Sequence, residues 1–249
     1  MSGPLGPSVL ITGSNRGLGL GIVKELVKVK EIEHIFAGCR NPTQAKELND
    51  LANTHESVHV VKFDVESDAD IKEAVKHVEK TVGNKGLNVL INNAAILTEN
   101  GAGYKHPDRE IMDRHMSVNV VSPFMITSAF LPLLQKNSSA DKPSLIVNIS
   151  SDCGSVADAT SLGPAWGNFA YGMTKAALNQ FTRYLSMEIS YNHVVTVAVH
   201  PGWLRTDMGG TAAPLSAVDG AKALIHTMQK LTIKDNGRYI DRNGRDMRF

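Results

Sequence analysis

The chain has 249 residues, a formal net charge of +1 and 42% hydrophobic residues, all ordinary for a globular protein. The near-zero charge gives no reason to expect nucleic acid or an anionic membrane surface as a partner, and no apolar run approaches the roughly 20 residues that span a bilayer. Two cysteines cannot build a disulfide framework, so with no secretory segment recognisable we expect a cytoplasmic protein without a membrane partner. The histidines and cysteines lack zinc-site spacing, so no metal is expected.

The first predicted strand, Ser8–Thr12, is a short run of mostly apolar, partly β-branched residues. It leads into a glycine turn, Gly13-x-x-x-Gly17-x-Gly19, and then into a helix with Leu18, Ile22 and Leu26 on one face. Glycines allow a pyrophosphate to approach the backbone, and the helix N-terminus offers unpaired N–H groups. The turn therefore predicts a phosphate-binding site, although its spacing is neither Gly-x-Gly-x-x-Gly nor a P-loop. A merely tight strand–helix turn is the alternative.

Strands and helices then alternate along the chain without repeats. We expect further strands at residues 34–39, 58–63, 88–91, 145–149, 194–199 and 238–240, and a long helix over about 109–134 with a break at Pro123. This alternation predicts an α/β fold of the doubly wound Rossmann type, with a parallel sheet of about seven strands and helices on both faces. No linker divides the chain, so residues 1–249 are expected to form a single domain, with residues 1–7 flexible.

A predicted helix that continues to about Ile189 contains Tyr171-x-x-x-Lys175, and Leu178, Phe181 and Leu185 are expected on its core face. Positions i and i+4 share a helix face, so the phenol and the ammonium can reach one site. A free phenol, with a pKa of about 10, is a poor proton donor at neutral pH, and a nearby cation lowers that pKa. In isolation, however, such a pair is common on solvated helices, so its interpretation depends on the other motifs.

The glycine turn and the Tyr171–Lys175 pair together resemble the short-chain dehydrogenase/reductase family, and the likeness spans nearly the whole chain. Other segments fall in family order. Asn92-Asn93-Ala94-Ala95 resembles the Asn-Asn-Ala-Gly turn, with alanine in place of the glycine; the matches to the helix asparagine, the catalytic serine and the Pro-Gly turn are Asn119, Ser151 and Pro201-Gly202.

Within this family, residues 10–21, 38–41 and 200–210 are similar to the sniffer-type carbonyl reductases. That resemblance implies reduction of a small-molecule carbonyl compound with NADPH. It also implies a homo-oligomer built on helix packing, with a dimer favoured. The segment between Ser151 and Tyr171 is longer than in the family, so it could obstruct a usual interface and a monomer stays open.

The resemblance implies a catalytic tetrad of Asn119, Ser151, Tyr171 and Lys175. Tyr171 would donate a proton to the carbonyl oxygen, while Lys175 would lower the pKa of Tyr171 and bind the nicotinamide ribose. Ser151 would orient the carbonyl, and Asn119 would hold a water that links Lys175 to solvent. The alternatives are a strand-end serine bonded to backbone for Ser151 and an asparagine tied to local backbone for Asn119.

The second predicted strand ends at Gly38-Cys39-Arg40, without the acidic residue that binds the ribose 2′-hydroxyl of NAD. Arg40 and Arg16 instead suit the 2′-phosphate of NADPH, although Arg40 as a solvated loop charge is the alternative. Asp64 resembles the family's adenine-contacting acid, and a loop aspartate that caps backbone is its alternative. The expected cofactor contacts are Gly13, Asn15, Arg16, Gly17, Leu18, Gly19, Arg40, Asp64, Val65, Asn92, Ala94, Tyr171, Lys175, Pro201, Gly202 and Thr206.

The substrate side is less specified. Trp166 and Phe169, in the long segment before Tyr171, and Trp203 and Met208, in a Gly- and Ala-rich segment that is a candidate lid, are candidate pocket residues. Cys153 is expected to be a small buried hydrophobe. Three alternative functions remain: an NADP(H)-sensing regulator without turnover, an epimerase or dehydratase, and an NADP-dependent alcohol dehydrogenase working in the oxidative direction.

Overall fold

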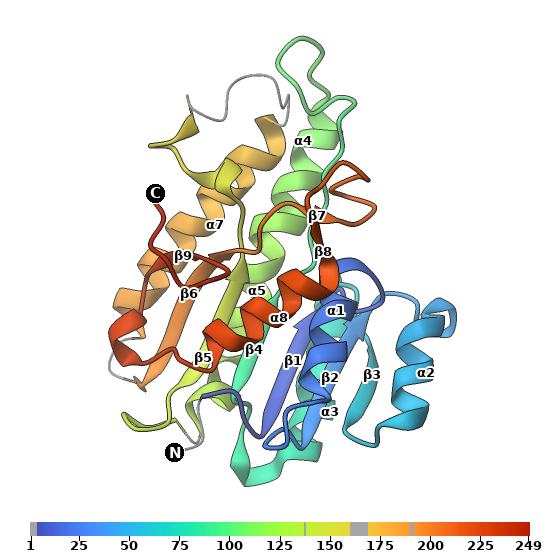
Figure 1. The fold of residues 1–249 in the computed structure, drawn as a ribbon, viewed down its shortest axis with the longest axis vertical. Coiled ribbons are helices and arrows are strands. Elements are labelled where there is room, and N and C mark those ends of the chain that lie inside the picture. The colour runs from blue at the N-terminus through green and yellow to red at the C-terminus, as the bar shows by residue number, and fades with distance from the viewer. Residues whose placement is uncertain (1–3, 137, 160–168, 190–191) are drawn as a thin grey trace.

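The computed structural model describes residues 4–136, 138–159, 169–189 and 192–249. Its centre is one seven-stranded sheet in which every neighbouring pair is parallel (Figure 1). The strand order is β3-β2-β1-β4-β5-β6-β9, with β1 at Ser8–Thr12, β2 at His34–Cys39, β3 at Val58–Lys62, β4 at Val89–Asn92, β5 at Ser144–Ile149, β6 at Val194–His200 and β9 at Tyr239–Asp241. The direction of winding reverses between β1 and β4, and the predicted doubly wound fold is confirmed.

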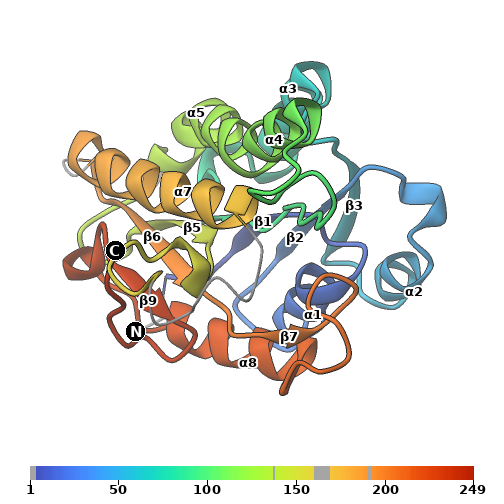
Figure 2. The same cartoon turned by 90° about the horizontal axis from the view of Figure 1, so that it is seen from above.

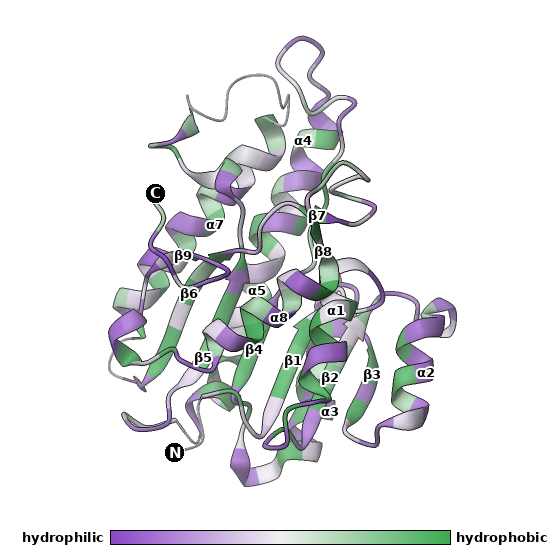
Figure 3. Cartoon of the chain, viewed as in Figure 1, coloured by the Kyte–Doolittle hydropathy of each residue, from purple (hydrophilic) through white to green (hydrophobic). Residues whose placement is uncertain are grey.

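Helices cover both faces of the sheet (Figure 2). One layer holds α1 (Gly17–Leu26), α2 (Lys46–Thr54) and α8 (Ala217–Met228), and the other holds α3 (Asp68–Val82), α4 (Arg109–Met116), α5 (Ser122–Gln135) and α7 (Phe169–Glu188). Side chains alternate along β1, so that Val9 and Ile11 join the core under α1 whereas Leu10 joins the core under α5. The inner strands β1, β2 and β4 are accordingly mostly hydrophobic, whereas the edge strand β3 is mixed (Figure 3).

The face of α7 that packs on the sheet is more polar than the expected face of Leu178, Phe181 and Leu185. Leu178 is buried and the partly buried Leu185 packs against the core, as expected, whereas Phe181 is partly buried and contacts Phe124 of α5. The other buried side chains of the helix are Ala170, Thr174, Lys175, Asn179, Thr182 and Ser186. Asn148 of β5 donates to Thr182 over 2.9 Å, and Ser150 donates to Asn179 over 2.6 Å. Hydrogen bonds therefore set the register of α7 on β5.

The helical stretch Arg109–Gln135 is interrupted by a π-helical segment, Ser117–Val121, near the predicted break. Pro123 has no N–H, so it cannot donate to the carbonyl of Asn119 as an α-helix would require. The stretch has 27 residues and a mean hydropathy of 1.6 over its best window, which corrects the expectation that no apolar run is long enough to cross a membrane. Half of that window is buried inside the molecule, as in a core helix.

Residues 4–7 are packed against the body of the protein. Leu5 is 2% exposed and joins the core, and the carbonyl of Pro7 accepts hydrogen bonds from the N–H groups of Glu33 and His34. The expectation of a flexible start is therefore wrong for this part of it, and residues 1–3 lie outside the described residues. Two short strands that the sequence did not predict, β7 (Leu204–Arg205) and β8 (Leu215–Ser216), pair with each other beyond the main sheet.

Candidate active site

The glycine turn after β1 has a backbone that only glycine adopts readily. Gly13 and Gly17 have φ values of 68° and 56°, in the left-handed region. A Cβ added to Gly19 would lie 2.2 Å from the carbonyl oxygen of Gly13, so the turn closes tightly on itself. The N-terminus of α1 consequently opens into a cleft with its first turn of backbone exposed to a ligand.

Asn93 fastens this turn to the end of β4. Its side-chain amide donates to the carbonyls of Thr12 and Gly13, over 2.8 and 3.2 Å. The hydroxyl of Thr12 in turn accepts from the N–H groups of Asn93 and Ala94, each over 3.0 Å. Sequence reasoning missed this role, although Asn93 stands in the recognised turn.

Asn92, expected among the cofactor contacts, points away from the cleft. Its side chain is 3% exposed and donates to Thr127 over 3.1 Å and to Asn148 over 2.8 Å, between the sheet and α5. Side chains alternate along a strand, so the last residue of β4 faces the core. The assignment of Asn92 is therefore corrected, and Asn93 lines the cleft in its place.

One cavity of about 1460 Å³ runs over the carboxyl ends of the strands and brings most of the predicted residues together. It is the place where ligands bind in open α/β sheets. The predicted residues that line it are Gly13, Asn15, Arg16, Gly17, Leu18, Gly19, Arg40, Asp64, Val65, Ala94, Ser151, Tyr171, Lys175, Pro201, Gly202 and Thr206.

Two charged residues of the cofactor half, Arg16 and Asp64, have partners within the protein. Arg16 forms a 2.6 Å ion pair with Asp207, which reaches across from the segment after Pro201-Gly202. Arg40 is exposed at the end of β2. Asp64 accepts a hydrogen bond from the N–H of Glu66 over 3.1 Å, as its alternative of a loop aspartate required, and it also lines the cleft.

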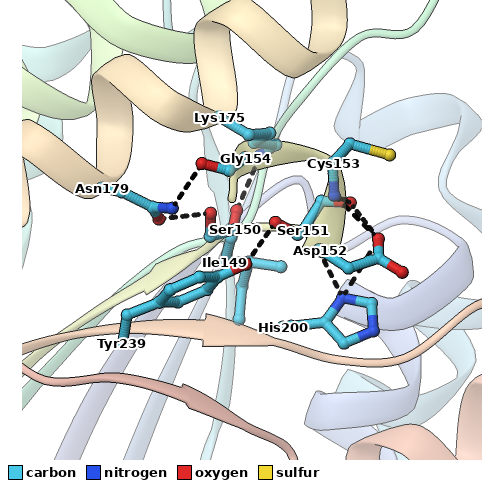
Figure 4. A network of polar contacts seen from close by, with 10 residues as sticks. All are labelled: Ile149, Ser150, Ser151, Asp152, Cys153, Gly154, Lys175, Asn179, His200 and Tyr239. Carbon is cyan, nitrogen blue, oxygen red and sulfur yellow. Dashed lines mark hydrogen bonds and ion pairs between the residues drawn. The ribbon is translucent and has the colours of Figure 1, made fainter. Parts of the chain in front are cut away.

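Ser151 is held from three sides at the end of β5 (Figure 4). Its hydroxyl donates to the carboxylate of Asp152 over 2.9 Å and accepts from the N–H of Cys153 over 3.2 Å. Its carbonyl accepts a 2.6 Å hydrogen bond from the hydroxyl of Tyr239 in β9. Ser151 is only 8% exposed, so these bonds fix both its main chain and its side chain.

Lys175 and Tyr171 lie together beside Ser151. The ammonium of Lys175 donates to the carbonyl of Ile149 over 2.6 Å and lies 5.4 Å from the centre of the Tyr171 ring. Burial lowers the pKa of Lys175 to about 8. Burial, reinforced by Cys153 and Asp152, also raises the pKa of Tyr171 above its ordinary value despite the opposing effect of the neighbouring Ser151 hydroxyl. The expectation that the Tyr171 pKa is lowered is therefore wrong for this site.

Asn119 lies in the π-helical segment and is 1% exposed. Its side chain accepts from the N–H of Ile96 over 2.8 Å, donates to the carbonyl of Ile96 over 2.9 Å and donates to Thr174 over 3.1 Å. These bonds follow the alternative of an asparagine tied to backbone, in this case across to a neighbouring segment. Asn119 thus joins the segment after β4 to α7, one residue before Lys175.

The substrate half of the cleft contains residues that sequence reasoning overlooked. His200, just before Pro201, accepts from the N–H of Asp152 over 3.1 Å, and burial lowers its pKa. In the sequence, these two residues could have been found only through their neighbours, because Asp152 follows the candidate serine and His200 precedes the Pro-Gly turn. Of the expected pocket residues, Phe169, Trp203 and Met208 line the cleft, as does Cys153, which is partly exposed rather than buried; Trp166 lies outside the described residues.

Comparison with known proteins shows the family to which the chain belongs. A model of the short chain dehydrogenase family matches residues 7–214, so the chain belongs to this family of oxidoreductases. It is 34% identical to an uncharacterized oxidoreductase of Schizosaccharomyces pombe over 223 residues, which cover 90% of this chain and 83% of the relative.

Two solved structures match over nearly their whole length. The carbonyl reductase Sniffer of D. melanogaster shares 36% identity and a TM-score of 0.91, with 97% of this chain and 99% of that chain covered. The NADPH-bound carbonyl reductase from chicken fatty liver shares 36% identity and a TM-score of 0.90, with 97% and 98% covered. The predicted family and the likeness to sniffer-type carbonyl reductases are confirmed.

Proposed function

We propose that this chain is an NADPH-dependent carbonyl reductase that acts on an aldehyde, ketone or quinone, with Tyr171 as the general acid. The observation that carries the proposal is that Ser151, Tyr171 and Lys175 meet in the same cleft as a glycine turn that exposes a helix N-terminus. The likeness to an NADPH-bound carbonyl reductase supports it.

The residues present fit the cofactor. The glycine turn and the N-terminus of α1 line the cleft, where a pyrophosphate can reach the backbone, and a Cβ at Gly13 would lie 3.0 Å from the Cα of Ala94 and force the turn apart. Arg16 and Arg40 line the same cavity, and the end of β2 carries no carboxylate to favour the 2′-hydroxyl of NAD. These charges are the reason to prefer NADPH over NADH.

When bound, NADPH supplies the hydride. Tyr171 keeps its proton at neutral pH because its pKa is raised, and it can give that proton to the carbonyl oxygen as negative charge develops there, since an alkoxide is a stronger base than a phenolate. Lys175, with a pKa of about 8, is mostly charged at pH 7 and stabilises the phenolate that remains. The oxidative direction needs Tyr171 as phenolate at the outset, which its raised pKa disfavours.

The proposal predicts carbonyl-dependent oxidation of NADPH, with little of NADH, across a panel of quinones, aromatic aldehydes and diketones. Tyr171→Phe should lower turnover by about 10²- to 10⁴-fold while NADPH binding, measured by fluorescence titration, stays within a few-fold of the parent value. NADPH binding without turnover of any carbonyl would favour the sensor. Equal turnover by Tyr171→Phe would remove the general-acid role.

A further inference from the structure

Ser151 has a single hydroxyl proton, and the neighbouring carboxylate holds it. The Oγ of Ser151 donates to Oδ1 of Asp152 over 2.9 Å, and the N–H of Cys153 donates to the same Oδ1 over 2.9 Å (Figure 4). A substrate carbonyl that is to be oriented by Ser151 has to compete for this proton. A carboxylate is the stronger acceptor, because a hydrogen bond to an ionised group is roughly twice as strong as one between neutral groups.

The remaining donors that the described residues offer Asp152 are weak or lack a proton, and the Cys153 thiol, which contacts the carboxylate, is only a weak donor. His200 is the other candidate, with Nδ1 at 3.8 Å from Oδ1 of Asp152. However, Nδ1 of His200 accepts from the N–H of Asp152, and burial lowers the pKa of this histidine, so Nδ1 carries no proton at neutral pH. The proton of Ser151 is consequently released most easily when the substrate itself satisfies Asp152.

The carboxylate is placed for such a contact. The side chain of Asp152 is 41% exposed and lines the cleft beside Ser151, and its Oδ2 has no hydrogen-bond partner within the described part of the chain. A carbonyl oxygen at hydrogen-bond distance from Oγ of Ser151 would lie about 4.7 Å from Oδ1 of Asp152, if the angle at Oγ is tetrahedral. A hydroxyl or ammonium group on the carbon next to the carbonyl can bridge that gap.

We propose that Asp152 is a specificity-determining residue that selects carbonyl substrates with a hydroxyl or ammonium group on the adjacent carbon. The donor binds Asp152 and thereby frees the Ser151 proton for the carbonyl oxygen. A carboxylate in the same position is rejected, because it would face Asp152 without a compensating cation. This inference rests on the proposed reductase function, and its test is built to separate the two.

The test compares phenacyl alcohol with its methyl ether, which has a similar shape but no donor, and with phenylglyoxylate, which has a carboxylate instead. The parent protein should prefer the alcohol over the ether by about 10- to 100-fold in kcat/KM, which is the strength of one charge-assisted hydrogen bond. In Asp152→Asn the preference should fall to within about 3-fold. Turnover of the ether should rise in this variant, because a neutral amide competes less for the Ser151 proton, and damage to the fold would not produce such a gain.

Asp158→Asn is the matched control, since it removes another carboxylate from the same segment while Asp158 pairs with Arg248 rather than with Ser151. It should keep the preference for the alcohol. An equal loss of preference in both variants would overturn the proposal and assign the effect to the net charge of the cleft. No preference in the parent protein would also overturn it.

Binding of the alcohol and the ether to the cofactor-free protein, followed by NMR titration, gives a second readout. Tighter binding of the alcohol that disappears in Asp152→Asn is expected even if no carbonyl is turned over. That outcome would support the role of Asp152 while the reductase proposal failed. If carbonyls are turned over but the alcohol and the ether bind equally well, the proposed reductase function is supported and the proposed role of Asp152 is excluded.

Discussion

At the scale of single residues, Lys175 couples the active site to the stability of the fold. Its pKa falls from 10.5 to about 8 through burial, so between these values the unfolded chain binds a proton that the folded chain has released. The free energy of unfolding therefore rises with pH across that window. The cost of burying the charged Lys175 ammonium is fully present below about pH 8. The shift corresponds to roughly 3 kcal/mol.

We predict that Lys175→Met removes this dependence. The difference in unfolding free energy between the variant and the parent protein should change by up to about 3 kcal/mol from pH 7 to pH 10.5, in favour of the parent protein as pH rises. The absolute gain at pH 7 is smaller, because the carbonyl of Ile149 loses its donor. Urea denaturation at several pH values measures the unfolding free energy of both proteins. If the two free energies change with pH in parallel, the lowered pKa of Lys175 is contradicted.

The ion pair between Arg16 and Asp207 gives a second residue-scale prediction. Both side chains are largely exposed, so the pair stabilises the fold by no more than about 1 kcal/mol. The pair matters for cofactor binding, because Asp207 competes with the 2′-phosphate of NADPH for the guanidinium of Arg16. Asp207→Asn should therefore tighten NADPH binding by about 2- to 5-fold in a fluorescence titration and leave NADH binding unchanged. A similar gain for both cofactors would mean that Asp207 repels the shared pyrophosphate instead.

At the scale of elements, predictions succeeded where the cause is local. The bounds of β1 and β2 match their predicted ranges, because each is a continuous apolar run closed by glycine or a charge. The break in the helical stretch was found near Pro123, since a missing N–H is readable from one residue. The polar inner face of α7 was missed, because its partners are Asn148 of β5 and Ser150 just after that strand, and no helical periodicity reveals them.

Strand β9 has a role in the site that its short length conceals. Tyr239 is 1% exposed, and its hydroxyl bonds the carbonyl of Ser151, 88 positions away in the sequence. Tyr239→Phe should lower stability by about 1–3 kcal/mol, because a buried carbonyl loses its donor. It should also lower kcat more than it weakens NADPH binding, since Ser151 loses an anchor while the glycine turn does not. Unchanged kcat together with lower stability would restrict Tyr239 to a structural role.

At the scale of the whole molecule, some residues of the candidate site could be predicted from local sequence motifs and others could not. The serine, tyrosine, lysine and glycine positions follow from motifs in family order, and the structure brings them into one cleft. Their partners do not follow, because Arg16 and Asp207 are 191 positions apart and meet only through the fold. Asn92 and Asn93 show the limit most sharply, since one step along a strand reverses the face on which a side chain lies.

The outer surface of the α5 and α7 layer leads to the last prediction, the homodimer proposed from the family resemblance. Val121, Phe124 and Met125 near the start of α5 are between 41% and 54% exposed, and Phe124 contacts Phe181 of α7 with ring centres 5.1 Å apart. On α7, Met173 and Tyr184 are exposed at positions that share one helix face. A surface of this kind commonly marks a protein–protein contact.

We therefore expect light scattering to give twice the chain mass for the parent protein and the chain mass for Phe124→Glu, since a buried carboxylate without a partner would oppose association. Ile233→Glu, which changes another exposed apolar residue in the turn after α8, should stay dimeric. Circular dichroism of both variants should match that of the parent protein. A monomeric parent protein, or dissociation by the Ile233 change alone, would exclude the α5 and α7 surface as the interface and leave the exposed aromatic residues without a partner of this chain's own kind.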